Sequence, residues 1–168
     1  TEAELADTAT NTLTLASSNG NFGGLALVND AVTAKATSGR LCFEARLKVG
    51  TTAVGNNLFV GLGDGAIAIA NPVVEAGTEL GAKSVGFFKD NTATTAVDTL
   101  SYGTSAASTT VELNAASLTA DTFIQLGMVL DPLNQTMRFF VDGVEANNTA
   151  AIAGDAFPNS VNLRPCLF

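Results

Sequence analysis

The chain has 168 residues, 46% hydrophobic and 14% charged, with eight basic residues, sixteen acidic residues and no histidine. The formal net charge of -8 works against nucleic-acid binding, because neutralising phosphates requires a patch of Lys and Arg. The missing histidine removes the commonest neutral-pH general base and the commonest transition-metal ligand, so we expect no catalytic residue, no metal site and no cofactor.

Short apolar runs, taken in chain order, predict an all-β protein. Residues 1–12 carry three acids and no strand pattern, which predicts an N-terminal arm ahead of one β-sandwich domain over residues 13–168. Runs bounded by Gly, Asn, Asp, Ser or Pro predict ten strands, over residues 13–17, 25–29, 41–49, 57–63, 84–89, 99–103, 109–113, 123–130, 137–141 and 161–167. Ten short strands without a long helix indicate a sandwich of two antiparallel sheets. We expect no membrane span, because no apolar run approaches the roughly 20 residues that crossing a bilayer requires.

Two of the predicted strands differ in how their faces are patterned. In residues 41–49 the odd positions are apolar, whereas Glu44, Arg46 and Lys48 share the other face, which predicts one buried and one wet face. In residues 123–130 both alternate sets contain apolar side chains. That pattern predicts a central strand with both faces buried.

The stretch 122–145 predicts a hairpin followed by a second tight turn. Its two apolar runs are separated by residues 131–135, and the second run ends at Asp142 and Gly143, a pair suited to a turn with positive φ. This unit resembles the β-sandwich of sugar-binding lectins and laminin-G domains.

Several segments together resemble a family of tailed-bacteriophage virion proteins. The resemblance depends on the order and spacing of residues 43–49, 59–64, 70–72, 84–88, 123–132, 138–145 and 161–166. It implies a concanavalin A-like jelly-roll β-sandwich, and a structural virion protein that decorates and cements the outer surface of a phage head. It also implies the major capsid protein as partner, a dimer or trimer on the capsid lattice, and a virion protein assembled in the host cytoplasm.

Members of this sandwich class usually have another strand after the segment that corresponds to residues 162–166, whereas the sequence stops at Phe168. We therefore expect either a longer natural C-terminus, or a last sheet position filled by the N-terminal segment or by a neighbouring subunit. The expected partner contacts lie in the arm and in an apolar loop at residues 66–74. They are Thr1, Glu2, Leu5, Ile67, Ile69 and Pro72.

Three other functions fit the same fold, and the residues favour them less. A retaining glycosidase needs two carboxyl groups about 5 Å apart, but Glu44 stands alone among Cys42, Arg46 and Lys48, where we expect a cross-strand ion pair. We therefore expect no enzyme. A carbohydrate-binding module on the virion, or a head-fibre or tail component, is the alternative, although the chain has no Trp and one Tyr, Tyr102.

Cys42 and Cys166 are the only cysteines. They could form a disulfide only if their strands are neighbours, and we expect two buried thiols instead.

Overall fold

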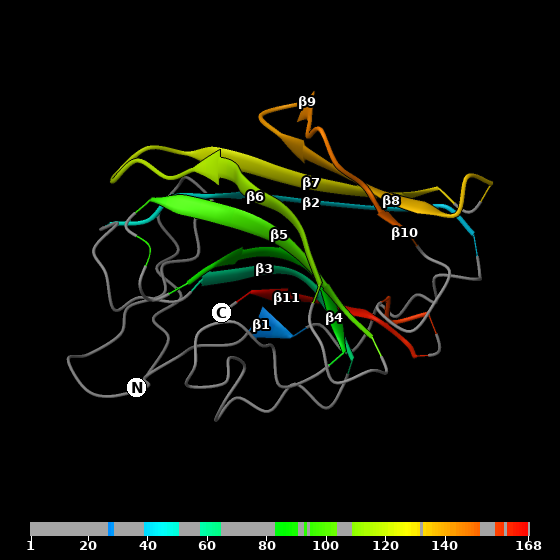
Figure 1. Cartoon of the computed structure of the whole chain (residues 1–168). Helices are drawn as coiled ribbons and strands as arrows, with labels where there is room; N and C mark the ends of the chain where they lie inside the picture. Colours follow the sequence, from blue (N-terminus) through cyan, green and yellow to red (C-terminus); the bar gives the residue numbers. More distant parts are fainter. Residues whose placement is uncertain are drawn as a thin grey trace.

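The computed structural model describes residues 27–28, 39–50, 58–64, 83–90, 93, 95–103, 109–131, 133–151, 157–159 and 161–167. These residues form two antiparallel sheets that face each other (Figure 1). The chain is therefore the all-β sandwich that the strand pattern predicted, with the jelly-roll architecture that the resemblance implied. Within the described residues no helix is long and apolar enough to cross a membrane.

The six-stranded sheet has the order β1-β11-β3-β4-β5-β6. Its strands are β1 (Leu27–Val28), β11 (Arg164–Leu167), β3 (Leu58–Gly63), β4 (Ser84–Lys89), β5 (Ala96–Tyr102) and β6 (Thr109–Ser117). Side chains on both faces of β3 and β4 are buried, which explains why these strands are nearly continuous apolar runs instead of alternating ones.

A pair of glycines shapes the second face of this sheet, where Phe59, Phe88, Leu100 and Cys166 are also buried. Gly61 lies opposite Gly86, and the ring of Phe59 packs over both. A Cβ atom on Gly86 would lie 2.5 Å from the backbone oxygen of Val60. The fold therefore requires glycine at this crossing.

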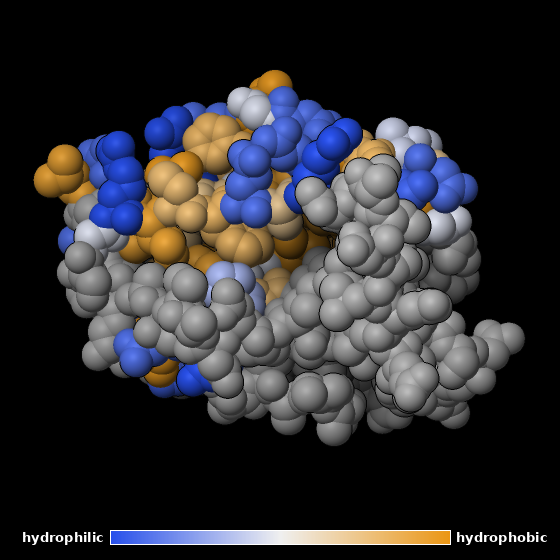
Figure 2. All heavy atoms as spheres, turned by 180° about the vertical axis from the view of Figure 1, so that it is seen from behind, coloured by the Kyte–Doolittle hydropathy of each residue, from blue (hydrophilic) through white to orange (hydrophobic). Residues whose placement is uncertain are grey.

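The five-stranded sheet has the order β10-β8-β7-β2, with β9 also paired to β8. Its strands are β2 (Leu41–Leu47), β7 (Ile124–Asp131), β8 (Thr136–Val141), β9 (Val144–Glu145) and β10 (Ala150–Ala151). Exposed residues alternate with less exposed ones along β2, as predicted, but the face that was predicted to be buried is only half-buried. Seen from behind, hydrophobic residues form a continuous area beneath a rim of hydrophilic residues (Figure 2).

The strand β7 is central, as predicted, because it lies between β2 and β8. The prediction that both of its faces are buried is wrong. Leu126, Met128 and Leu130 are buried in the core, whereas Gln125 and Gly127 on the other face are only half-buried.

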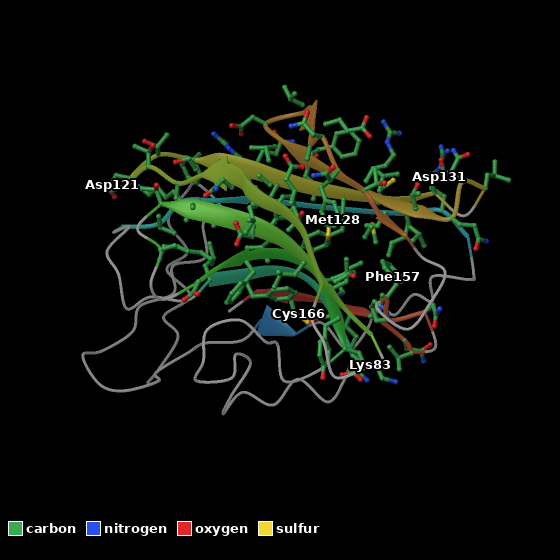
Figure 3. All side chains as sticks on the ribbon, in the orientation of Figure 1. Lys83, Asp121, Met128, Asp131, Phe157 and Cys166 are labelled. Atoms are coloured by element: carbon green, nitrogen blue, oxygen red, sulfur yellow. The ribbon has the colours of Figure 1, made fainter. Side chains whose placement is uncertain are left out.

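The hydrophobic core lies between the sheets. Met128 from β7 and Phe157 point into this space (Figure 3), and both are buried. Phe87 of one sheet meets Phe139 of the other edge to face, with ring centroids 5.6 Å apart and an interplanar angle of 85°. Contacts of this geometry stabilise a core beyond the area that they bury.

The predicted strands agree with the observed ones except at a few places. The strand predicted over residues 99–103 begins earlier, at Ala96, and the one predicted over 109–113 continues to Ser117. The two-residue strands β9 and β10 were not predicted. The predicted strand over residues 13–17 and the arm over 1–12 lie outside the described residues, so the arm and the division into 1–12 and 13–168 remain predictions.

Candidate functional site

The outer face of the five-stranded sheet is the side that points away from the core, and we call it the open face. Its side chains come from four strands, and neighbours across the strands are fixed by the register. They are Cys42, Glu44 and Arg46 of β2, Gln125, Gly127 and Val129 of β7, Arg138 and Phe140 of β8, and Glu145 of β9.

A single row crosses this face at its centre. Glu44 lies opposite Gly127, Gly127 lies opposite Phe140, and Phe140 lies opposite Glu145. The row therefore places one aromatic ring beside a position without a side chain, between two carboxylates. A flat apolar floor with polar groups at its margins results.

Gly127 is not required by the backbone or by packing. A Cβ atom at this position would lie 3.6 Å from the Cβ of Phe140 and 3.7 Å from the backbone oxygen of Phe43, both ordinary contact distances. Glycine inside a strand is unfavourable by about 0.5–1 kcal/mol relative to alanine, because its unfolded chain has more freedom. A glycine that costs stability and fills no tight crossing marks a place where another molecule can approach the sheet closely.

Phe140 is held between charged side chains. The guanidinium of Arg138 lies with its Cζ 5.2 Å from the ring centroid of Phe140. Arg138 also donates two hydrogen bonds to Glu145, one from Nε to Oε1 at 2.6 Å and one from Nη2 to Oε2. These hydrogen bonds lower the pKa of the Glu145 carboxyl and raise the pKa of Arg138, so the pair stays ionised and keeps the ring in place.

A second aromatic residue stands at the other end of the face. Phe123 is 43% exposed, and the guanidinium of Arg46 lies over its ring with Cζ 4.4 Å from the centroid. The ammonium of Lys48 lies 5.7 Å from the same centroid. Cation–π contacts of this kind keep long basic side chains close to the sheet surface.

Two aspartates at the ends of these strands shape turns, as the sequence predicted. Asp131 accepts hydrogen bonds from the backbone N–H groups of Leu133 and Asn134 and from the side-chain amide of Asn134, and the last of these is the main reason that its pKa is lowered. Asp142 has a φ of 50° in the second tight turn, and its Oδ1 accepts the backbone N–H of Gln125. These hydrogen bonds direct neither carboxylate towards the centre of the open face.

The structure tests only some of the candidate residues that were chosen from the sequence. Six of them, Thr1, Glu2, Leu5, Ile67, Ile69 and Pro72, lie outside the described residues, so their role in partner contact remains a prediction. The expected cross-strand ion pair of Glu44 is wrong within the described residues, where the one salt bridge joins Arg138 and Glu145. The reason is the register, which places Gly127 opposite Glu44.

The structure also places the two cysteines and Tyr102, which the sequence analysis had considered. Cys166 is buried, as predicted, but the prediction that Cys42 is buried is wrong, because β2 turns Cys42 to the exposed face. Both thiols are free, and they lie in different sheets. Tyr102 ends β5 in the six-stranded sheet, away from the open face.

Phe123, Gly127 and Phe140 were not selected from the sequence. A signal for Phe140 was present, because Phe139 and Phe140 are consecutive in a strand and one of the two must point away from the core.

Over the described parts of the chain, no group of three or more Cys, Asp and Glu side chains is placed to hold a metal ion.

Comparison with known proteins gives a likeness of shape alone. No family model and no curated protein matches the sequence. Two solved structures of the CBM40 of Ruminococcus gnavus IT-sialidase are similar at 10% sequence identity, one of them bound to α2,3-sialyllactose. Their TM-scores are 0.45 and 0.46, with 76% and 79% of this chain covered.

This chain spans less than two thirds of either of those structures, 61% and 65%. These comparisons do not test the capsid role, the capsid partner or the virion location, which depend on the sequence resemblance and remain predictions. The ligand of the open face therefore has to be inferred from the geometry of the face itself.

Proposed function

We propose that this chain is a binding module and that the open face of its five-stranded sheet binds a carbohydrate. The observation that carries the proposal is the row of Glu44, Gly127 and Phe140. A sugar ring has an apolar C–H face and a margin of hydroxyl groups. The ring of Phe140 and the bare backbone at Gly127 offer a floor for the first, and the Glu44 carboxylate offers an acceptor for the second.

Two further features of the face support a sugar over a purely apolar ligand. Glu44 and Arg46 have no hydrogen-bond or ion-pair partner among the described residues, so their donors and acceptors are available to a ligand. Phe140 is already oriented by Arg138 and Glu145, which reduces the entropy that binding must overcome.

The spacing of the carboxylates supports binding without hydrolysis. Glu44 and Glu145 are separated by three strand intervals, which corresponds to about 14 Å at the usual strand spacing. Paired carboxyl groups of glycosidases lie about 5–10 Å apart. Glu145 is also occupied by Arg138, whose hydrogen bonds lower its pKa and oppose a role as general acid.

Glycan-array screening followed by calorimetry with the best glycan tests the proposal. We expect weak to moderate binding, and a loss of about tenfold or more in affinity on Phe140→Ala, since a central aromatic contact is removed. Gly127→Leu should abolish binding, because the leucine side chain would cover the floor of the site. The Cβ atom of this leucine fits without a clash, so the variant can keep the fold. Leu133→Ala is the matched control, since Leu133 is 89% exposed in the turn that follows β7.

Three outcomes would contradict parts of this proposal. Failure of the wild-type chain to bind any glycan, or binding that both face variants leave unchanged, would exclude the open face as a sugar site. Release of product from a bound glycan, abolished by Glu44→Gln, would show an enzyme instead of a binding module.

The capsid-decoration hypothesis drawn from the sequence makes a separate prediction. A cement protein is present in hundreds of copies per particle, and its removal lowers the resistance of the particle to heat. Copy number in purified virions and heat resistance of stripped particles test that hypothesis independently of glycan binding.

A further inference from the structure

The strand β2 forms the margin of the five-stranded sheet. Within the described residues it pairs with β7 alone, through seven consecutive partners without a register shift. It contains neither Pro nor Gly, and it has no bulge. A regular edge strand of this length presents unpaired backbone N–H and C=O groups that can accept another strand.

The core-facing side chains of β2 are covered incompletely. Leu41, Phe43, Ala45 and Leu47 are half-buried, whereas their partners on β7, from Ile124 to Leu130, are at most 8% exposed. The apolar area visible from behind agrees with such an uncovered margin (Figure 2). One more strand beside β2 would remove this apolar surface from water, which is favourable.

The charges on the opposite face of β2 specify which strand fits. Glu44 and Arg46 are exposed, lie two residues apart on the same face, and form no ion pair with any described residue. The stacking of Arg46 on Phe123 leaves the edge of its guanidinium available. A matching strand must present a positive charge opposite Glu44 and a negative charge opposite Arg46.

We propose that a second copy of this chain binds here, with the two β2 strands antiparallel about a two-fold axis through Ala45. In this register Glu44 lies opposite Arg46 of the partner subunit, and the contact occurs twice by symmetry. On the other face Phe43 lies opposite Leu47 of the partner subunit. A register centred on Glu44 would instead place two like charges opposite each other, so the charges select the register centred on Ala45.

The dimer places two open faces on one continuous sheet. At the usual strand spacing, Gly127 of one copy lies roughly 15 Å from Gly127 of the partner subunit. Two sites at this distance on one surface would bind a repeating ligand with avidity. The Glu44 carboxylate has two oxygens, so it can accept from Arg46 of the partner subunit and from a sugar hydroxyl at the same time. The dimer itself does not depend on what the open face binds.

Sedimentation velocity from micromolar to near-millimolar concentration tests the dimer. Glu44→Arg and Arg46→Glu should each raise the dissociation constant by about tenfold, because two attractive contacts become repulsive. The double variant Glu44→Arg/Arg46→Glu should restore dimerisation. Lys83→Glu is the control, since it changes charge to the same extent as Arg46→Glu outside β2.

Cross-linking tests the register separately. In the proposed dimer, residue 48 lies opposite Cys42 of the partner subunit, and within one chain the two positions are about 20 Å apart and cannot bond. Lys48→Cys should therefore give a covalent dimer on mild oxidation, whereas Lys48→Cys/Cys42→Ser should not. A monomer at all concentrations, a trimer, a dimer unaffected by the charge variants, or no cross-link would overturn the proposal.

Discussion

The two sheets use glycine for opposite purposes. In the six-stranded sheet Gly61 and Gly86 meet at a crossing so tight that a Cβ on either would lie within 2.5 Å of a backbone oxygen. In the five-stranded sheet a Cβ atom on Gly127 would have room, since the nearest atom, the Cβ of Phe140, would lie 3.6 Å away. The first pair serves the packing of the fold, whereas the second position is unexplained by packing and is therefore the better indicator of a binding surface.

The same difference appears in the faces as a whole. The six-stranded sheet buries Phe59 and Phe88 on the side away from the core, so both of its faces have a structural role. The five-stranded sheet has Phe123 and Phe140 on its outer side, each in contact with a basic side chain. An aromatic ring that is oriented by charge and left accessible can contact a ligand, whereas a fully buried ring cannot.

The substitution Gly86→Ala should have the largest effect on stability. The added methyl would collide with the backbone of β3, where Val60 and Gly61 cannot move away without disturbing the sheet. We expect a loss of about 3 kcal/mol in the free energy of unfolding, measured by urea denaturation followed by circular dichroism.

The matched variant Gly127→Ala should be neutral or more stable than the wild type. Its methyl fits, and alanine reduces the freedom of the unfolded chain, so we expect a gain of up to about 1 kcal/mol. Equal losses in the two variants would remove the distinction between the two sheets.

The sequence predicted most strands because burial imposes a period on them. β2 alternates since one face is wet, and β4 matches its predicted bounds because a continuous apolar run ends at Lys89 and Asp90. The start of β5 was missed since Asp98 interrupts its apolar pattern. The structure explains this aspartate, because its Oδ1 accepts the backbone N–H of Asn114 at 2.7 Å, where the ladder with β6 shifts register.

The candidate site was harder to predict because it depends on pairing between strands. Glu44, Gly127 and Phe140 are separated by long stretches of sequence and become neighbours only through the register of β2, β7 and β8. The strand β9 was missed for a related reason, since two residues carry no period of their own and Val144–Glu145 pairs only because the turn at Gly143 returns the chain to β8. The period of a strand indicates the face on which a side chain lies but not its neighbour across the sheet.

Acid should weaken the hairpin of the five-stranded sheet through Asp131, which lies at the opposite end of the sandwich from Asp121 (Figure 3). The side-chain amide of Asn134 contributes most to lowering the pKa of Asp131, so the folded state favours the carboxylate. Its stabilisation is complete above the pKa of the unfolded chain, near 3.9, and is lost as pH falls towards the lower folded-state pKa.

The variant Asp131→Asn should remove this contribution. We expect the wild type to lose more stability than the variant between about pH 5 and pH 2, by a smaller amount than Gly86→Ala costs. Urea midpoints measured across this pH range for both proteins provide the comparison. Parallel curves for the two proteins would mean that Asp131 has the same pKa folded and unfolded.

Labelling of the two thiols compares the open face with the second face of the six-stranded sheet, and it requires no substitution that alters stability. Cys42 is exposed on the open face, whereas Cys166 is 2% exposed on the second face of the six-stranded sheet. Burial raises the pKa of Cys166 to about 11, so roughly one molecule in a thousand has the reactive thiolate there at about pH 8. We expect a thiol reagent to label Cys42 rapidly and Cys166 only when the chain unfolds.

Mass spectrometry of the labelled peptides separates the two sites, and Cys42→Ser should abolish the rapid phase. Across a urea series the labelling of Cys166 should follow the global unfolding transition, because its Sγ lies against the backbone oxygen of Arg164 within the sheet. Rapid labelling of Cys166 in the native protein would mean that the second face of the six-stranded sheet opens to solvent. The glycine pair Gly61 and Gly86 would then border an accessible surface, and Gly127 would no longer be distinguished from it by exposure.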